Sequence, residues 1–519
     1  MSRRAGGRNA RVSLRNAPLA EHIKPVHPGE LGGQYRPLSE ADMEQINATV
    51  FRILEDIGFA QATPHCIATC TAVGAVLGED GRLRMPRAVV EAALQQAERN
   101  LVLYGQKPEY DLHISGKRVH FATAGAAVMV VDLENNTYRD SHAQDLYDMA
   151  RIADTCDHIH LFQRMCVLRD IEDNYQMDLN TTYCAVKGTA KHVGSSWTQA
   201  WHLEKTLEML HLIAGSEAAW RARPFVSQSN CFVVPPMKFA QDALECLRVA
   251  VEGGMPVLLL SAAQAGATAP ACLAGAVAQA WAECLGGLVY VNAMRPGAPA
   301  ILGTWPFISD LRTGAMSGGS PEQGLLSAAC MQMGHFYGLP SSTACGMSDA
   351  KFPDFQAGAE HASNAMVAAL SGGNIVYEAA GMYASLLSAC PESLLLDNDV
   401  LGATLRVVHG MQVTEESLSF ETIRQVCCEG PGHYLGAEQT LSVMQTDYIY
   451  PQFGDRTSPK EWEERGRPVL LDKVIKRKHE ILQHHFPDHI SPEVDARIRE
   501  AFPIFLPADA VNARSKEAL

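Results

Sequence analysis

The chain has 519 residues, of which 47% are hydrophobic and 19% are charged, and its formal net charge is −15. This composition is typical of a folded globular enzyme with a large core, and it excludes an intrinsically disordered chain. The acidic balance argues against nucleic acid as a partner. No run of about 20 apolar residues occurs, so we expect no membrane span.

The fourteen cysteines are scattered through alanine- and leucine-rich segments, and no Cys-x-x-Cys pair with zinc spacing occurs. We therefore expect reduced thiols, a cytoplasmic protein and no bound metal. Residues 1–36 are expected to form a basic flexible arm, because their first part is rich in arginine and lacks the apolar run of a signal peptide.

Residues 37–115 predict an N-terminal helical extension or cap. In the segment 39–59, apolar residues such as Met43, Ile46 and Val50 recur at helical spacing. A second helix is predicted over 86–100, with Pro86 in its first turn.

From about Val119 the pattern changes to short apolar runs, each followed by an amphipathic segment. The candidate strands read VHFATAGAAVMVVD, HIHLFQRMCVL, KHVGSSW, PFVSQSNCFV, PVLLLSAAQ, LVYVNAMR with PAILGTW, SSTACGM and NIVYEAAGM. Continuous apolar runs followed by helices predict a parallel sheet that is buried on both faces. About eight such units over 116–390 favour an α/β fold of the (β/α)₈ TIM-barrel type. No G-x-G-x-x-G follows the first strand, which disfavours a dinucleotide fold.

Residues 391–519 are rich in His, Pro and charge. We expect them to form a C-terminal helical extension that packs over the barrel and takes part in a homo-oligomer interface.

The loops after the sixth, seventh and eighth predicted strands hold most of the candidate site residues, because catalytic side chains of such barrels lie where strands end. They supply aromatics (Trp305, Phe307, Phe352, Phe355, Tyr377), acids (Asp310, Asp349, Asp354, Glu360, Glu378) and bases (Arg312, Lys351, His361). An unpaired carboxylate at Glu378 would be costly, so we expect it either to pair, for example with Lys351, or to face the pocket. Trp305 either plugs the barrel top or lines the pocket, and Asp354 is expected to cap a helix.

Several ordered segments carry a resemblance to a known family. They read GGSPEQGLLSAACMQMGHFYGLP, SDAKFPDFQAGAEH, NIVYEAAGM, LLLDNDV, GHYLGAEQT and YPQFGDR. From about Pro37 to Phe453 the chain resembles the trimethylamine methyltransferase family. The resemblance implies a barrel enzyme that moves a methyl group from a small-molecule amine to the cobalamin of a separate corrinoid protein.

The chain departs from the founding members of that family immediately before SDAK. Those members carry a pyrrolysine there, whereas this sequence has Met347, or Gly346 if the loop shifts by one. A tertiary amine needs protonation or capture before it can leave, but a quaternary ammonium leaves as a neutral amine and needs only orientation. The sequence therefore predicts a quaternary amine substrate, such as glycine betaine or a similar betaine. The alternatives are trimethylamine as the substrate and a non-catalytic betaine-binding barrel.

This hypothesis assigns a role to each candidate residue. A trimethylammonium group suits an aromatic cage, for which the candidates are Trp305, Phe307, Tyr377 and Phe355. A carboxylate suits the cationic side chains Arg312, Lys351 and His361, and Arg312 is favoured because it can bind in a bidentate manner. The His361 side chain lies on a predicted helix, where a structural role is the alternative. Catalytic or electrostatic roles are expected for Asp349, Lys351 and Glu378, and corrinoid contacts for Gly346, Met347 and Ser348.

Overall fold

The computed structural model of the protein describes residues 23–430 and 432–511, so the arginine-rich start of the predicted arm lies outside the described residues. Eight parallel strands form a closed ring, in which β9 pairs with β10 on one side and with β6 on the other. In chain order they are β6 (Arg118–Thr123), β9 (Leu161–Gln163), β10 (His192–Ser195), β11 (Val226–Gln228), β12 (Val257–Ser261), β14 (Ala300–Thr304), β17 (Ser341–Ala344) and β18 (Ile375–Ala380). The predicted (β/α)₈ barrel is confirmed.

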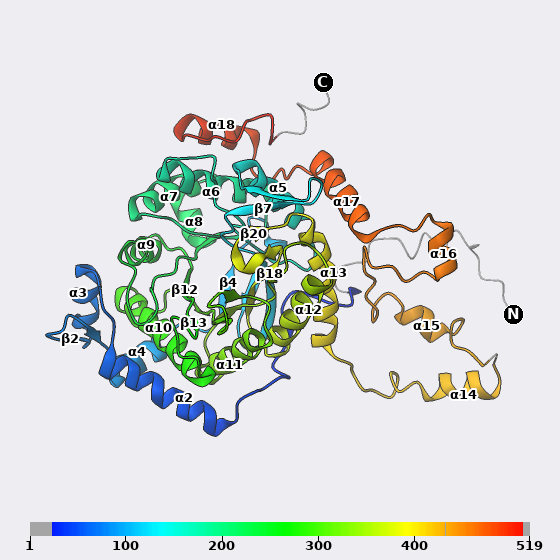
Figure 1. Ribbon diagram of the computed structural model, residues 1–519, viewed down its shortest axis with the longest axis horizontal. Coiled ribbons are helices and arrows are strands. Elements are labelled where there is room, and N and C mark those ends of the chain that lie inside the picture. The colour runs from blue at the N-terminus through cyan, green and yellow to red at the C-terminus, as the bar shows by residue number, and fades with distance from the viewer. Residues whose placement is uncertain (1–22, 431, 512–519) are drawn as a thin grey trace.

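Each barrel strand is followed by a helix of the outer ring, which surrounds the strands in Figure 1. These helices are α5 (Ala143–Asp154), α6 (Asn174–Gly188), α7 (Ala200–Ala214), α9 (Gln241–Glu252), α10 (Leu273–Met294), α11 (Pro321–Tyr337), α12 (Phe355–Leu370) and α13 (Ser393–His409). A short helix, α8 (Glu217–Ala222), follows α7. Asp354 caps α12 as predicted, because its side chain accepts the backbone N–H of Ala357 at 2.9 Å.

The run LVYVNAMR was wrongly predicted to be part of a strand. It forms the last turns of α10, and the sixth barrel strand is the following run alone. Helix α10 packs on β12 and β14 at one side and on helices of the N-terminal extension at the other. Because it is buried on all sides, its sequence is apolar without a helical period, and the pattern resembles that of a buried strand.

The N-terminal extension contains helices and two small hairpins. Its elements are α2 (Glu40–Arg52), the π-helix η2 (Ile53–Ile57), α3 (Pro64–Ala72), β2 (Val76–Leu77) with β3 (Leu83–Arg84), α4 (Arg87–Gln96), and β4 (Leu101–Leu103) with β5 (Leu112–Ile114), between which lies the 3₁₀-helix η3 (Pro108–Tyr110). Ahead of them, β1 (Glu30–Leu31) pairs antiparallel with the start of β6.

Two small sheets cover the end of the barrel where the strands terminate. The first contains β19 (Met382–Tyr383), β20 (Ser388–Ala389), β7 (Met129–Asp132) and β8 (Thr137–Asp140), which belong to the loops after β18 and β6. The second contains β13 (Gln264–Ala265), β15 (Phe307–Ser309) and β16 (Met316–Ser317), from the loops after β12 and β14. We call these two sheets the roof.

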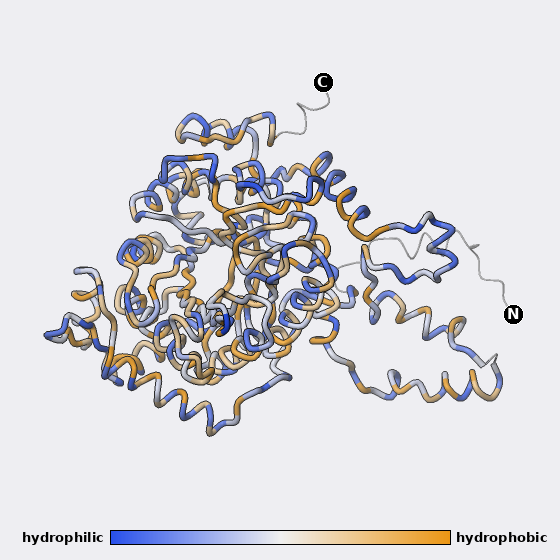
Figure 2. Tube along the Cα trace, in the orientation of Figure 1, coloured by the Kyte–Doolittle hydropathy of each residue, from blue (hydrophilic) through white to orange (hydrophobic). Residues whose placement is uncertain are grey.

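After α13 the chain continues as α14 (Phe420–Cys428), α15 (Glu438–Val443), α16 (Pro459–Glu464), α17 (Leu470–His484) and α18 (Pro492–Ala501). Helix α17 packs on α5 and α13, and α18 packs on α7. Helices α14 and α15 extend away from the barrel (Figures 1 and 2). They carry exposed apolar side chains, such as Phe420 of α14 and Leu441 of α15. The homo-oligomer stays a prediction.

All fourteen cysteines are free thiols. No helix within the described part of the chain has both the length and the apolar character that a membrane crossing requires.

Candidate functional site

Polar side chains without protein partners gather where the barrel strands end. Gln163 ends β9, Gln228 ends β11 and Thr304 ends β14, while Thr343 and Tyr377 lie on β17 and β18. Each is buried and has a polar atom with no hydrogen-bond partner among the described residues. Leaving such an atom unpaired costs about 1–3 kcal/mol. A concentration of such atoms at the carboxyl ends of the strands makes this end of the barrel the candidate ligand site.

Glu378 is the one titratable acid on the barrel strand β18. It is 1% exposed, and its backbone has a φ of +59° at a register shift in the pairing with β6. Its Oε2 accepts the N–H of Gly125 at 3.0 Å. Burial raises the pKa of Glu378 to about 8, although Gly125 and the charge of Arg164 act in the opposite direction. A strained backbone and a shifted pKa together are typical of a functional carboxyl group.

Two of the predicted aromatic residues lie side by side next to Glu378. The rings of Trp305 and Tyr377 have centroids 5.0 Å apart and planes inclined by 41°. The indole N–H of Trp305 donates to Ser342 at 3.4 Å, and the Tyr377 hydroxyl has no partner within the described residues. Phe307 is buried in the roof strand β15. The structure therefore stacks Trp305 on Tyr377, and Glu378 is the next residue of β18.

Three predicted ligand residues instead face solvent. Phe355 is the first residue of α12 and is 92% exposed. The Arg312 side chain is 88% exposed and forms a bidentate pair with Asp310, at 3.0 and 2.8 Å. Lys351 is exposed and its Nζ donates to the backbone oxygen of Asp349 at 2.5 Å, so it does not pair with Glu378. These positions correct the prediction that the three residues line the pocket.

Arg312 and Asp310 lie beside a cleft outside the barrel mouth. The cleft has a volume of about 510 Å³ and lies between β15, β16 and the starts of α10 and α11. Its lining residues are Ala265, Ala271, Leu273, Ile308, Ser309, Asp310, Leu311, Arg312, Ser317, Ser320 and Glu322. None of the stacked aromatics or Glu378 contributes to it.

His361 has a structural position between α12 and α13. Its Nδ1 lies 2.6 Å from Asp397, and its Nε2 lies 3.3 Å from the carbonyl oxygen of Met382. Burial would lower the pKa of His361, but the charge and hydrogen bond of Asp397 and the Met382 carbonyl raise it above the usual value. Both ring nitrogens face acceptors, an arrangement that favours the doubly protonated imidazolium. Both side chains are buried, so His361 cannot offer its charge to a substrate in the mouth.

Asp349 joins the loops that follow three strands. Its carboxylate accepts hydrogen bonds from the Ser317 hydroxyl at 2.6 Å, the Gly318 N–H at 2.6 Å and the Ser385 hydroxyl at 2.5 Å. Asp349 thus links the loop after β17 to those after β14 and β18, and its observed contacts are structural.

The segment that was predicted to face the corrinoid lies beneath the roof. Gly346 has a φ of +109°, which favours glycine. Met347 is fully buried, and a Cβ on Gly318 would lie 2.5 Å from both its Cγ and its Sδ. The Ser348 hydroxyl donates to Glu360 at 2.6 Å. None of these three side chains is an electrophile.

The sequence prediction missed the opposite wall of the mouth. Gln163 donates to Ser229 at 2.7 Å, and a Cβ on Gly194 would lie 1.8 Å from its Oε1. Arg164, the next residue, has a buried Nε without a hydrogen-bond partner in the described chain. The signal was present in the sequence, since Gln and Arg end the apolar run HIHLFQR and Gln ends PFVSQ. Polar residues at the ends of buried parallel strands are site candidates.

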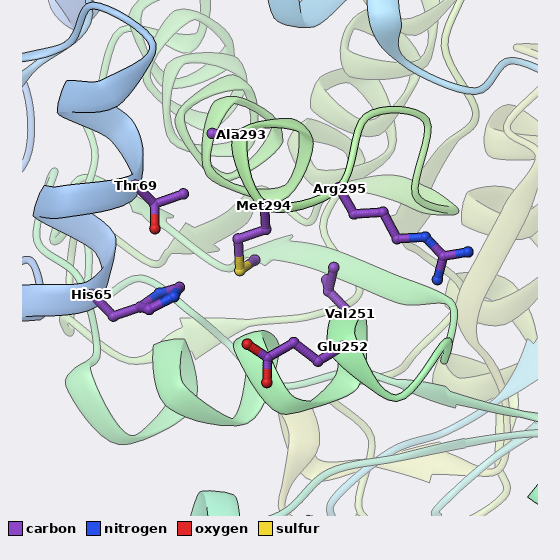
Figure 3. A pocket seen from close by; sticks show the side chains of 7 residues that line it. All are labelled: His65, Thr69, Val251, Glu252, Ala293, Met294 and Arg295. Carbon is purple, nitrogen blue, oxygen red and sulfur yellow. The ribbon is translucent and has the colours of Figure 1, made fainter.

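A second hollow lies at the other end of the barrel (Figure 3). It has a volume of about 380 Å³ and is lined by His65, Thr69, Val251, Glu252, Ala293, Met294 and Arg295. These residues come from α3 and from the ends of α9 and α10, which return to the amino-terminal side of the strands. That side of a (β/α)₈ barrel contributes stability, and active sites lie at the other. Within residues 23–430 and 432–511 no group of three His, Cys, Asp or Glu side chains could hold a metal ion.

Comparisons with known proteins agree with the fold. The family model of trimethylamine methyltransferase matches residues 4–505. The glycine betaine methyltransferase of Desulfitobacterium hafniense strain Y51 is 28% identical over 91% of this chain and 97% of its own. The trimethylamine methyltransferase MttB of Methanosarcina barkeri is 30% identical over 86% of this chain and 90% of its own.

Among solved structures, the monomethylamine methyltransferase MtmB of Methanosarcina barkeri superimposes with a TM-score of 0.50 at 11% identity. The alignment covers 86% of this chain and 89% of that one, and it supports the barrel fold alone. Because the family model spans nearly the whole chain, the protein is a methyltransferase that belongs to the trimethylamine methyltransferase family.

Proposed function

We propose that this protein transfers a methyl group from a quaternary amine, glycine betaine or a similar betaine, to the corrinoid of a separate protein. The observation that carries the proposal is the stacked pair of Trp305 and Tyr377, with the buried Glu378 next to Tyr377 in β18, and we assign this pair to the ammonium group. Aromatic faces attract a quaternary ammonium by about 0.5–2 kcal/mol each. The relatives at 28–30% identity include enzymes named for both glycine betaine and trimethylamine, so identity alone does not select the substrate.

The residues around Met347 favour a donor that needs no activation. A methyl carbon on a quaternary nitrogen is attacked in line, the C–N bond breaks, and its electron pair stays on nitrogen, which leaves as a neutral tertiary amine. This step requires orientation and exclusion of water. Trp305 and Tyr377 would orient the ammonium group, and the roof would exclude water. Neither Gly346 nor Met347 offers an electrophile that could capture the amine.

The acceptor is expected to reach the substrate from the side of the roof. A corrinoid held by a partner protein would supply a cobalt(I) nucleophile that accepts the methyl group. Buried Met347 lies under Gly318, and the roof loops are joined by Asp349, so they must separate to admit so large a group. Asp349 would hold the site closed between turnovers.

Trimethylamine is the second candidate, and Glu378 is the observation that favours it. With a pKa of about 8, this carboxyl group is mostly protonated at neutral pH and could protonate a leaving secondary amine. A barrel that binds betaine without transferring its methyl group is the third candidate.

A methyl-transfer assay separates these candidates. Purified protein is mixed with reduced corrinoid protein and, in parallel, with glycine betaine, other betaines and trimethylamine. The proposal predicts consumption of cob(I)alamin and formation of dimethylglycine from glycine betaine, and little reaction with trimethylamine. If no betaine consumes cob(I)alamin, the proposed function is wrong. Calorimetric binding of betaine without any transfer would identify the non-catalytic barrel.

A further inference from the structure

We infer that Arg164 binds the carboxylate of the substrate and thereby selects zwitterionic betaines over amines that lack an acid group. This inference rests on the proposed function and names the residue that recognises the part of the substrate remote from the reacting methyl. The cationic residues that the sequence suggested for this task, Arg312, Lys351 and His361, face solvent or lie in a buried structural pair.

The backbone of Arg164 is held at the mouth of the barrel. The residue directly follows β9, its N–H donates to Gly194 at 3.0 Å, and its carbonyl accepts the N–H of Ala126 at 2.9 Å. The side chain is half-buried, with a fully buried Nε. Arg164 is therefore fixed at the end of a central strand, while part of its side chain remains accessible.

The guanidinium group has no hydrogen bond or salt bridge within the described residues. The two carboxylates whose charges act on it are Asp178 and Glu378, and both are engaged elsewhere. One oxygen of Asp178 accepts the backbone N–H of Thr198 at 2.7 Å, its hydroxyl at 2.8 Å and Nδ1 of His202 at 2.6 Å. Burial lowers the pKa of Arg164 from its usual value, and the charges of Asp178 and Glu378 act in the opposite direction.

An unpaired, half-buried guanidinium at the end of a barrel strand is suited to one class of ligand. It presents a planar set of donors that matches a carboxylate in a bidentate arrangement. Leaving it without a partner is costly, and a bound carboxylate would remove that cost. Glycine betaine carries such a group one methylene away from its quaternary nitrogen.

Arg164 lies at the same end of the barrel as the Trp305–Tyr377 pair, because it directly follows β9. Barrel strands β14, β17, β18, β6 and β9 are consecutive neighbours around the ring. Trp305 and Tyr377 stand on the first part of this arc, and Arg164 on its end. Gly125 connects the two parts, because a Cβ there would lie 3.2 Å from Glu378 Oε1 and 2.9 Å from Gln163 Cγ. Glu378 on β18 and Arg164 directly after β9 are therefore separated by one strand, β6. We assign the cation of the ligand to the Tyr377 side of this arc and its carboxylate to Arg164.

The test compares Arg164→Gln and Arg164→Lys with the wild type. Arg169→Gln is the matched control, because Arg169 belongs to the same loop, is exposed and pairs with Asp140 at 3.3 Å. Binding of glycine betaine and of choline, which has the same cation but no carboxylate, is measured by calorimetry. Methyl transfer to reduced corrinoid protein gives KM and kcat for both compounds, and circular dichroism verifies that each variant is folded.

We expect Arg164→Gln to weaken glycine betaine binding and raise its KM by about 10- to 100-fold, which is typical of a lost charged hydrogen bond. Choline binding should change less than about threefold. Arg164→Lys should recover part of the affinity, because lysine retains the positive charge but lacks the planar pair of donors that binds a carboxylate in a bidentate manner. The control should resemble the wild type.

An equal loss for glycine betaine and choline, or no loss for either, would overturn the role of Arg164. If wild-type protein transfers the methyl of glycine betaine and Arg164→Gln does so with an unchanged KM, the proposed function is supported. The inference that Arg164 binds the carboxylate is then wrong. If Arg164→Gln weakens glycine betaine binding but the wild type transfers no methyl group, the inference that Arg164 binds the carboxylate is supported. The proposed function is then wrong. If Arg164→Gln fails to fold, Arg164→Lys tests the inference instead. A lower ratio of glycine betaine affinity to choline affinity than in the wild type would support the role of Arg164, and an unchanged ratio would overturn it.

Discussion

Replacing Glu378 by glutamine should remove a pH dependence from the stability of the protein. In the folded state burial raises the pKa of Glu378 from 4.5 to about 8, whereas the unfolded chain exposes the carboxyl group to water. Between these two values the folded protein keeps the proton and the unfolded chain releases it. The unfolded state thus binds fewer protons, and stability falls as pH rises through this interval. A glutamine has no such titration.

The size of the effect follows from the two pKa values. From about pH 5 to about pH 8, each pH unit costs about 1.4 kcal/mol, so the total loss is about 4 kcal/mol. For a chain of 519 residues the unfolding entropy is about 1.1 kcal/mol/K. The melting temperature of the wild type should therefore drop relative to Glu378→Gln by about 4 °C over this range.

Thermal unfolding followed by circular dichroism at a series of pH values measures this difference. Glu322→Gln is the control, because Glu322 is exposed at the start of α11. The curves of wild type and control should run together, while that of Glu378→Gln diverges upward as pH rises. Parallel curves for wild type and Glu378→Gln would refute the reasoning, because Glu378 would then be ionised in the folded protein.

Three further predictions concern the cage, the buried ion pair and the roof. Trp305→Ala should weaken glycine betaine binding by about 2- to 30-fold through loss of a cation–π contact, measured by calorimetry, with Trp462→Ala, on the distant α16, as the unaffected control. His361→Gln should destabilise the protein by about 3–5 kcal/mol, because it leaves Asp397 buried without its cation. Because the pKa of His361 is raised in the folded state, the full loss of stability is expected below about pH 6.5, and the loss should shrink as pH rises through the folded pKa. A loss of melting temperature that grows with pH would contradict a charged pair of His361 and Asp397. Asp349→Ala leaves three hydrogen-bond donors unpaired, at a cost of about 1–3 kcal/mol each. Amide hydrogen exchange over residues 314–318 and 384–387 should therefore accelerate. Unchanged exchange would exclude a role of Asp349 in holding the roof loops together.

The barrel was predictable from the sequence because its signals are local. Each buried parallel strand forms a short apolar run, and each following helix has its own cap or apolar stripe. Helix α10 was the exception: it is buried between the barrel and the N-terminal extension, so no polar face reveals its period. The position of Trp305 directly after β14 followed from the same local reasoning, whereas Glu378, expected in the loop after the eighth strand, lies within β18.

The sequence by itself determined the fold class and the absence of an electrophile at Gly346 and Met347. The tertiary structure decided which charged residues share the mouth. Arg312 and Lys351 belong to the same loops as the aromatics, but the hairpin β15–β16 and the turn before α12 direct them to solvent. Arg164, more than a hundred residues away in the chain, lies on the same arc as Glu378 because ring closure places β18, β6 and β9 side by side. Closure of the barrel depends on pairing between distant strands, and no local pattern records which loop residues that pairing brings together.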